Sequence, residues 1–128
     1  MTEAEIQAAI QRDLGRGETR IFRNHVGQGW TGELVKSDDG VVVLRNARPA
    51  RFGLADGSHD LIGIRRLLIT PEMVGGHIGA FLSVEVKSPT GRTSASQDRW
   101  TNMVRAFGGL AGAARSVDQA RLIARLDP

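Results

Sequence analysis

Near the N-terminus, apolar residues recur every three or four positions, at Ile6, Ala9, Ile10 and Leu14. This spacing predicts an amphipathic helix over residues 3–14. The stretch Thr-Glu-Ala-Glu that opens it has the form of a capping box, and the glycines after Leu14 favour its end. The chain therefore begins with a surface helix that has one apolar face.

Helical spacing returns in the C-terminal third, at Trp100, Met103, Val104 and Phe107. It predicts a helix over residues 95–107, preceded by a second capping-box pattern from Ser94 to Gln97. A strand of small residues is expected at 110–114. After it, Ser-Val-Asp-Gln caps a last helix with a largely apolar sequence.

Between these helices the pattern changes to alternation, which is typical of strands. Residues 19–26 alternate and predict a strand, followed by a loop over Gly27–Trp30. The apolar runs 34–36 and 41–44 flank Ser-Asp-Asp-Gly, a good hairpin signal. The arginine-rich stretch 45–51 reads as a basic connector, either solvated or holding a phosphate backbone.

Two further strands are predicted, at 60–64 and at 80–88, the second being the clearest in the chain. Residues 67–70 either continue the first of them or start a turn, and 71–79 reads as a loop. The order is helix, strand, hairpin, strand, strand, helix, strand, helix. This order favours a mixed α/β sheet with helices on its faces.

Length and composition limit the class of protein. A chain of 128 residues, 41% hydrophobic and 24% charged, is expected to form one globular domain. No apolar stretch approaches a membrane span, and the acidic N-terminus lacks a signal-peptide pattern, so a cytoplasmic protein is expected. The absence of cysteine excludes disulfides and thiolate metal sites. Carboxylate ligands then favour Mg²⁺ or Mn²⁺ over a soft metal.

The basic residues are nearly all arginines. Net charge is +3, and of 17 basic residues only Lys36 and Lys87 are lysines. The planar guanidinium can donate two hydrogen bonds to a phosphate at once. An arginine-rich genome accounts for the same composition equally well, so the charge alone is weak support for nucleic acid.

Candidate chemistry lies on the strand at 80–88. Alternate side chains share one face of a strand, so Ser83, Glu85 and Lys87 should point one way with Phe81. The residues between them, Leu82, Val84 and Val86, should then point into the core. A carboxylate and an ammonium are costly to bury unless paired or bound to a metal. Their face must therefore be solvent or a site.

A second carboxylate opens the other strand. Aspartate is disfavoured in strands, yet Asp60 directly precedes apolar residues and follows the tight turn 56–59. Together Asp60 and Glu85 would offer a divalent ion two hard oxygen ligands, and the Val86 carbonyl a third. The Lys87 ammonium would then orient an attacking water and stabilise charge developing on phosphorus. Two carboxylates, a metal and a lysine suit the hydrolysis of a phosphodiester.

These residues match the D…ExK form of the PD-(D/E)xK nucleases, with 25 positions from Asp60 to Glu85. The surrounding blocks GSHDLIG, VEVKSPTGRTSASQ and GGLAGAARSVDQA resemble the virus-type replication-repair nuclease (VRR-NUC) domain. The resemblance extends from Glu3 to Leu126. It implies a restriction-endonuclease-like core, with a mixed central sheet flanked by helices, and a metal-dependent DNA endonuclease.

The resemblance also assigns roles. It implies that Asp60 and Glu85 are metal ligands, that Lys87 is the catalytic lysine and that Gln97, opening the following helix, lies near the site. Glu5 matches a glutamate of the first helix that is often a further metal-site residue. Both Gln97 and Glu5 have an alternative explanation, because each occupies the third position of a capping box. His59 stands where the wider superfamily often has proline.

Other conspicuous residues are assigned ordinary roles. His25, His59 and His77 do not share metal-ligand spacing and are expected on the surface. Trp100 and Phe107 are expected in the core. Trp30, between glycines, either packs on the sheet or contacts DNA.

Stand-alone members of the family resemble resolvases of branched DNA such as four-way junctions, and the compact form suggests a phage gene. One active site per chain and two symmetric cuts together predict a C₂ homodimer. The arginines expected to hold the DNA backbone are Arg45, Arg48, Arg51, Arg92 and Arg99. The alternatives are a nucleic-acid-binding module without cleavage, and a nuclease acting on flaps, nicks or linear duplex.

Overall fold

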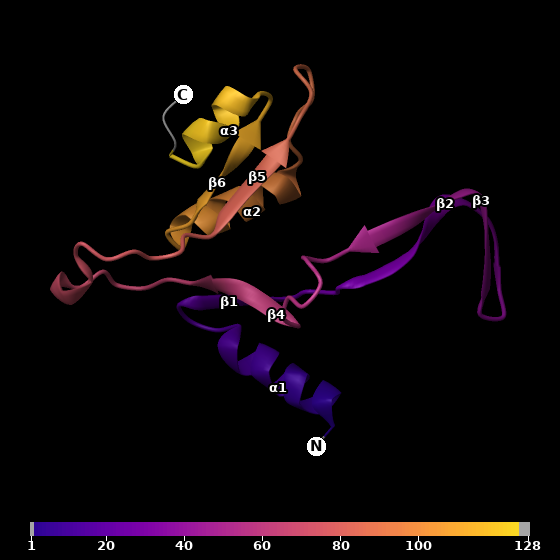
Figure 1. Cartoon of the computed structure of the whole chain (residues 1–128), viewed down its shortest axis with the longest axis horizontal. Helices are drawn as coiled ribbons and strands as arrows, with labels where there is room; N and C mark the ends of the chain where they lie inside the picture. Colours follow the sequence, from indigo (N-terminus) through magenta and orange to yellow (C-terminus); the bar gives the residue numbers. More distant parts are fainter. Residues whose placement is uncertain (1, 126–128) are drawn as a thin grey trace. The chain divides into compact units, whose positions relative to one another are not determined.

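The computed structural model describes residues 2–125 and has a mixed α/β composition (Figure 1). Its elements are, in order, α1 (Glu3–Leu14), β1 (Thr19–Arg23), β2 (Gly27–Asp38), β3 (Val41–Phe52), β4 (Leu61–Arg65), the 3₁₀ turn η1 (Pro71–Met73), β5 (Leu82–Val86), α2 (Ala95–Ala106), β6 (Leu110–Ala114) and α3 (Val117–Ile123). This order of helices and strands is the predicted one.

The chain divides into two compact units. One comprises the residues up to Arg20 together with those from Gly63 onward, and the other is Ile21–Ile62. Among the described residues the strands form three two-stranded sheets, β1 with β4, β2 with β3, and β5 with β6. The structure therefore has small sheets where the sequence predicted a single mixed one.

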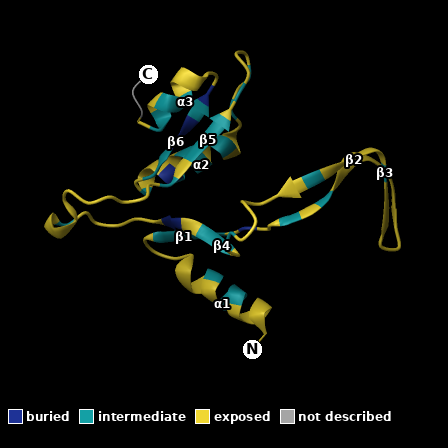
Figure 2. Ribbon diagram, viewed as in Figure 1, coloured by how far each residue is buried: buried dark blue, intermediate teal, exposed yellow. Residues whose placement is uncertain are grey.

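The larger unit holds the buried core. Strands β5 and β6 run parallel, and both α2 and α3 contact β6 (Figure 1). Val104 of α2 is fully buried and packs with Ile64 and Ala111, and four larger, partly buried side chains pack against them. These are Phe81, Trp100, Met103 and Phe107. Figure 2 shows buried positions on α2 and β6. The prediction that Trp100 and Phe107 belong to the core is confirmed.

Local capping signals are confirmed at all three helices. Thr2 with Glu5 and Ser94 with Gln97 each form a complete capping box, with side chain and backbone bonded reciprocally. The Ser116 side chain accepts a hydrogen bond from the Gln119 backbone N–H at the start of α3. These bonds satisfy amide donors that have no partner within the first helical turn.

The unit Ile21–Ile62 is dominated by a long ribbon of two antiparallel strands, β2 and β3. The predictions of a loop at Gly27–Trp30 and of a connector at 45–51 are therefore wrong. Glycine and proline are individually unfavourable in a strand, but the cross-strand pairing of β2 with β3, with Trp30 opposite Pro49, forms the ribbon all the same. Proline is tolerated because both strands of a two-stranded sheet are edges. Asp39 and Gly40, both with positive φ, make the two-residue turn at the tip.

Several element ends differ from the predicted ones. Strand β1 stops at Arg23, three residues early, and β4 begins at Leu61, just after Asp60. Strand β5 is shorter than the predicted 80–88. Residues 67–70 form no strand, and η1 lies in the predicted loop that follows. The sequence pattern thus overestimates the length of β1 and β5, because strands end where backbone pairing ends.

Candidate functional site

Glu85 and Lys87 lie together at the carboxyl end of β5, as the sequence predicted. The Lys87 Nζ is 3.3 Å from the Glu85 Oε1, and the two side chains are 21% and 37% exposed respectively. The Lys87 backbone N–H donates to the Ala114 carbonyl at 3.0 Å, which continues the pairing with β6 beyond the end of the strand. Both charged groups are therefore paired and half-buried on a fixed backbone.

Gln97 connects this carboxylate to the start of α2. Its Nε2 donates to the Glu85 Oε1 at 2.9 Å, while its Oε1 accepts from the Ser94 backbone N–H at 2.9 Å. The two bonds fix the orientation of the amide. Gln97 caps α2 and contacts Glu85 at the same time, so its capping role is confirmed and its role in a functional site stays a prediction. The Gln97 amide and the Lys87 ammonium both contact the Glu85 Oε1, and neither contacts the Glu85 Oε2.

We expect the Gln97→Glu substitution to separate these two roles. A glutamate also completes a capping box, so α2 should keep its stability in thermal unfolding. The donation to Glu85 is lost and replaced by a like charge. If Glu85 is the metal ligand that the resemblance implies, cleavage of DNA should therefore fall about 10–100-fold, the usual cost of removing a residue that orients a ligand. Gln119→Glu in α3 is the control, because Gln119 is also the third residue of its helix and its Oε1 also accepts from a backbone N–H, that of Arg115. If both variants cleave like the parent chain, Gln97 is only a cap.

The face of β5 that carries these groups is the one that packs on α2. Trp100 Nε1 donates to the Ser83 Oγ at 2.9 Å, and the Phe81 and Trp100 rings meet edge to face at 6.3 Å. The expectation that the opposite face points into the core is wrong at two positions, since Leu82 is 48% and Val86 77% exposed. Alternation predicted which side chains share a face, but not which face the helix covers.

Asp60 lies in the unit Ile21–Ile62, immediately before β4. Its backbone carbonyl accepts from the Asn24 N–H at 2.8 Å, which anchors the residue to the end of β1. The preceding turn is closed by the Ser58 N–H bonding the Ala55 carbonyl at 3.0 Å, with Gly57 at a φ of 84°. The carboxylate is thus presented at the junction of a tight turn and a strand.

Asn24 is the residue that the sequence reasoning missed. It is 8% exposed and hydrogen-bonds the segment that leads to Asp60. The signal available in the sequence was an asparagine, a poor strand former, inside a stretch predicted as strand. The structure ends β1 just before it.

The remaining predicted ligands have clear structural positions. The Glu5 carboxylate accepts from the Thr2 backbone N–H at 2.7 Å and from its hydroxyl at 3.1 Å. Val86 is the last residue of β5 and is paired with Ala114. Among residues 2–125, no three acidic or histidine side chains gather into a metal-binding cluster. The roles of Glu5 and Val86 at a metal stay predictions.

The Thr2 backbone bond, and then the Thr2 hydroxyl bond, hold the pKa of Glu5 below its ordinary value of 4.5. Because this pKa is lowered by folding, the contribution of the ionised cap is present above pH 4.5 and is lost as pH falls through the lowered pKa. We expect the Glu5 carboxyl carbon, followed by NMR, to titrate with a pKa below the ordinary glutamate value of 4.5. A Glu5 pKa at the ordinary value would show that the capping box does not persist in solution.

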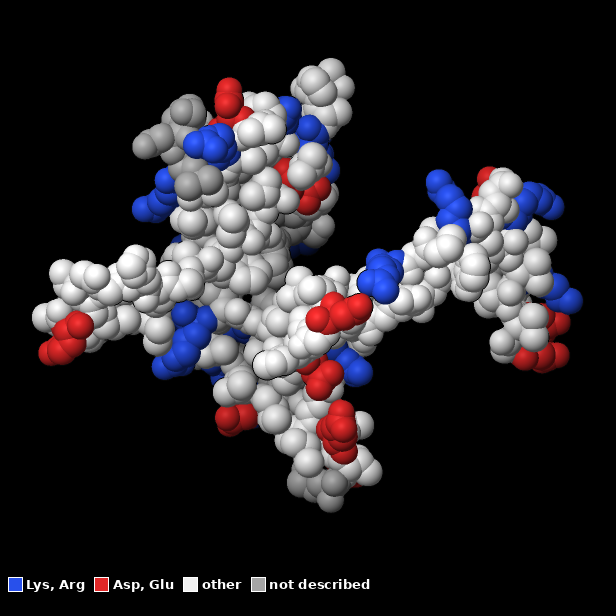
Figure 3. Space-filling view, viewed as in Figure 1, with Lys and Arg blue, Asp and Glu red and all other residues white. Residues whose placement is uncertain are grey.

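Three of the predicted DNA-binding arginines, Arg45, Arg48 and Arg51, lie on β3 and are exposed. Figure 3 shows basic side chains along the β2–β3 ribbon and acidic ones at its tip, where Asp38 and Asp39 stand. Arg51 also pairs with Asp56 at 3.4 Å. The other two predicted arginines, Arg92 and Arg99, are exposed in the larger unit.

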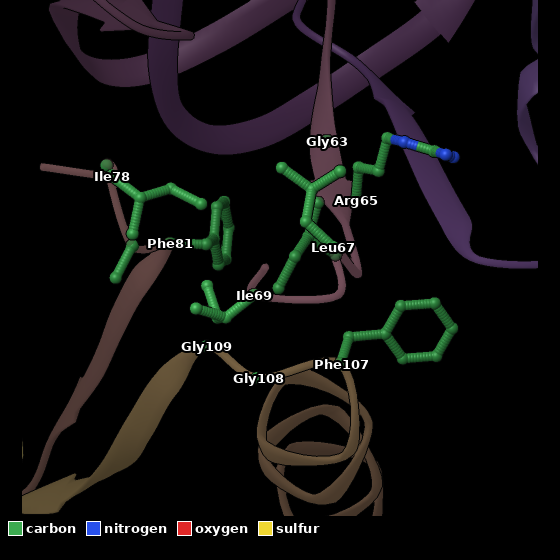
Figure 4. A pocket seen from close by; sticks show the side chains of 12 residues that line it. Gly63, Arg65, Leu67, Ile69, Ile78, Phe81, Phe107, Gly108 and Gly109 are labelled. Atoms are coloured by element: carbon green, nitrogen blue, oxygen red, sulfur yellow. The ribbon is translucent and has the colours of Figure 1, made fainter. Parts of the chain in front are cut away.

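A separate pocket of about 420 Å³ lies in the larger unit (Figure 4). Leu67, Ile69, Ile78 and Phe81 contribute apolar walls, and Arg65 is its charged residue. None of the predicted catalytic or metal-ligating residues lines it. The pocket is therefore distinct from the groups around Glu85.

A family model described as the VRR-NUC domain matches residues 41–118, which is more than half of the chain. The chain belongs to the VRR-NUC family. The match contains Asp60, Glu85, Lys87 and Gln97, and it confirms the family that the three sequence blocks predicted. No curated protein and no solved structure matches the chain.

Membership of the VRR-NUC family implies a nuclease-type function and hence binding of nucleic acid. None of the helices described in residues 2–125 is long and apolar enough to cross a membrane. The groups at the end of β5 are compatible with a nuclease, because the Glu85 carboxylate and the Lys87 ammonium lie together beside Gln97 at the start of α2.

Proposed function

We propose that this VRR-NUC protein is a metal-dependent, structure-selective DNA endonuclease that cuts branched DNA such as four-way junctions. One observation carries the proposal. The Glu85 carboxylate is held through a single oxygen by Gln97 and Lys87, at the end of a strand and the start of a helix. A simple surface ion pair between Glu85 and Lys87 would not need an additional hydrogen bond from Gln97, whose position is fixed by the start of α2.

The donor groups available to the site fit a hard divalent cation. Asp60 and Glu85 supply carboxylate oxygens and Val86 a carbonyl oxygen, and the chain has no thiolate. Mg²⁺ commonly uses one or two carboxylates and keeps several waters, so a large protein cage is not required. We assign the Glu85 Oε2 to the ion, because Gln97 and Lys87 already occupy Oε1.

Bound Mg²⁺ or Mn²⁺ would make a water more acidic and neutralise charge on the phosphate. Lys87 then has two tasks in this proposal, to orient the attacking water and to stabilise the negative charge that develops on phosphorus. The water oxygen attacks phosphorus as the bond to the 3′ oxygen breaks, leaving a 5′-phosphate and a 3′-hydroxyl. Gln97 keeps the Glu85 carboxylate in place during the reaction.

The arginines of β3 are suited to hold the DNA backbone. Arg45 and Arg48 are exposed on a narrow ribbon, and the major groove of DNA admits a two-stranded ribbon. Backbone contacts of this kind position a protein without reading sequence, as selection by DNA shape requires. A symmetric junction is cut twice, so we propose that two copies act as a C₂ homodimer.

A panel of labelled DNAs tests the proposal, comprising a four-way junction, a flap, a nicked duplex and an intact duplex, each with Mg²⁺, with Mn²⁺ and with chelator. We expect paired symmetric cuts in the junction, dependent on the metal. Preferential cutting of flaps or nicks would keep the nuclease chemistry and overturn the junction preference. Binding without cleavage under all conditions would instead favour a non-catalytic DNA-binding module.

A further inference from the structure

Asn24 occupies an unusual position in its unit. Within Ile21–Ile62 it is the one residue that the structure buries, and its side chain is polar. A buried amide is costly unless its donors and acceptor are satisfied. Since apolar packing does not account for its burial, its hydrogen bonds must.

Those hydrogen bonds all reach the segment that ends at Asp60. The Asn24 Nδ2 donates to the Ser58 Oγ at 2.8 Å and to the His59 carbonyl at 2.9 Å. The Oδ1 accepts from the Leu54 backbone N–H at 3.0 Å. The Asn24 backbone N–H adds the bond to the Asp60 carbonyl. One residue thus fixes both ends of the turn and the backbone of Asp60 itself.

Close backbone contact reinforces this attachment at Gly53. Gly53 has a φ of 81°, and a Cβ atom built there would lie 2.7 Å from the Val26 Cα. The turn can therefore lie directly on the segment that follows Asn24 only because residue 53 has no side chain. The hydrogen bonds and the contact at Gly53 hold the same loop from two sides.

We propose that Asn24 is a positioning residue, which clamps the loop from Gly53 to His59 and so fixes the Asp60 carboxylate for metal binding. The inference rests on the proposed function, and it adds a residue outside the region matched by the family model. Asp60 follows a turn containing Gly57, and glycine has more backbone conformations open to it than any other residue. The clamp removes that freedom before the ion binds, so binding does not have to order the loop.

The first test needs no metal and no DNA. Hydrogen exchange of the Leu54 amide reports the bond to the Asn24 Oδ1 directly. We expect the Asn24→Ala variant to lose protection at Leu54 while amides of α2 remain protected. The control is Asn102→Ala, an exposed asparagine on α2, which should leave Leu54 protected. Retained protection at Leu54 in Asn24→Ala would overturn the clamp.

The second test is calorimetric titration with Mn²⁺. Asn24→Ala should bind Mn²⁺ about 10–100-fold more weakly, the usual loss when a residue that orients a ligand is removed. At saturating Mn²⁺ its cleavage rate should largely return, whereas a merely structural defect would lower the folded fraction seen by circular dichroism. Ser58→Ala removes one acceptor and is the milder variant if Asn24→Ala folds poorly, with a smaller loss in the same direction.

The outcomes separate the two proposals. If the parent chain binds Mn²⁺ and Asn24→Ala binds it equally well, the positioning role is wrong and the proposed function stands. If the parent chain binds no Mn²⁺ and cuts no DNA, the proposed function is wrong, and the role of Asn24 falls with it.

Discussion

Asp60→Asn and Glu85→Gln should each abolish metal-dependent cleavage of a four-way junction. Each change keeps the size of the side chain and removes one negative charge from the proposed ion site. We expect the cleavage rate to fall by about 10³-fold, the upper end of the cost of removing one preorganised electrostatic group. Gel analysis of a labelled junction under single-turnover conditions measures the loss.

Two substitutions serve as matched controls, Asp13→Asn at the exposed end of α1 and Glu72→Gln in η1. They change the net charge by the same amount without touching the proposed site, so they should cleave like the parent chain. Parent-like cleavage by Asp60→Asn or Glu85→Gln would show that the carboxylate in question is not a ligand. Equal losses in variants and controls would show that the loss does not come from removing an ion ligand, because a more positive net charge favours DNA binding.

Lys87→Met should separate chemistry from metal binding. The variant keeps the length of the side chain and loses the ammonium that contacts the Glu85 Oε1. Mn²⁺ affinity should be kept or increased, because a cation next to the ion site is removed, while the cleavage rate should fall about 10²–10³-fold. Calorimetry and single-turnover cleavage measured on the same preparation distinguish the two effects.

The chain supplies its own control for this experiment, because Lys36 on β2 is its one other lysine. Lys36→Met should affect cleavage little, since the residue is exposed on the ribbon. If Lys87→Met retains full cleavage, the ammonium only pairs with Glu85. If it loses Mn²⁺ binding as well, Lys87 supports the carboxylate and its role in the chemical step is unsupported.

Features with local signals could be predicted from the sequence. Both capping boxes, the helix at Glu3–Leu14 and the small-residue strand at Leu110–Ala114 appear where their patterns placed them. A capping box needs contacts only three residues apart, and helical spacing repeats within one element. Such features depend little on the rest of the fold.

Features that depend on partners far along the chain were missed. The ribbon from Gly27 to Phe52 contains glycines and a proline that weaken any single strand, and only the pairing of β2 with β3 makes it regular. The same limit applies to Asn24, whose side-chain bonds reach 30 to 35 residues ahead. No spacing rule connects residues at that separation.

The candidate site contains features that local sequence patterns predict and features that depend on packing with distant parts of the chain. The family resemblance implied that Gln97 lies near Glu85, and the capping pattern marked the helix start at which Gln97 stands. Alternation along β5 correctly grouped Glu85 with Lys87 and Ser83, yet placed Leu82 and Val86 in the core. Periodicity gives the relative direction of side chains, whereas the packed face is chosen by whichever helix covers it.

We propose that Asp60 and Glu85 bind one divalent ion together. This proposal can be tested with a crystal grown with Mn²⁺ and anomalous diffraction recorded near the manganese edge. We expect a single strong peak about 2.0–2.2 Å from a carboxylate oxygen of each residue, a distance typical of small hard cations. A peak bound by one carboxylate alone, or no peak near either, would contradict it.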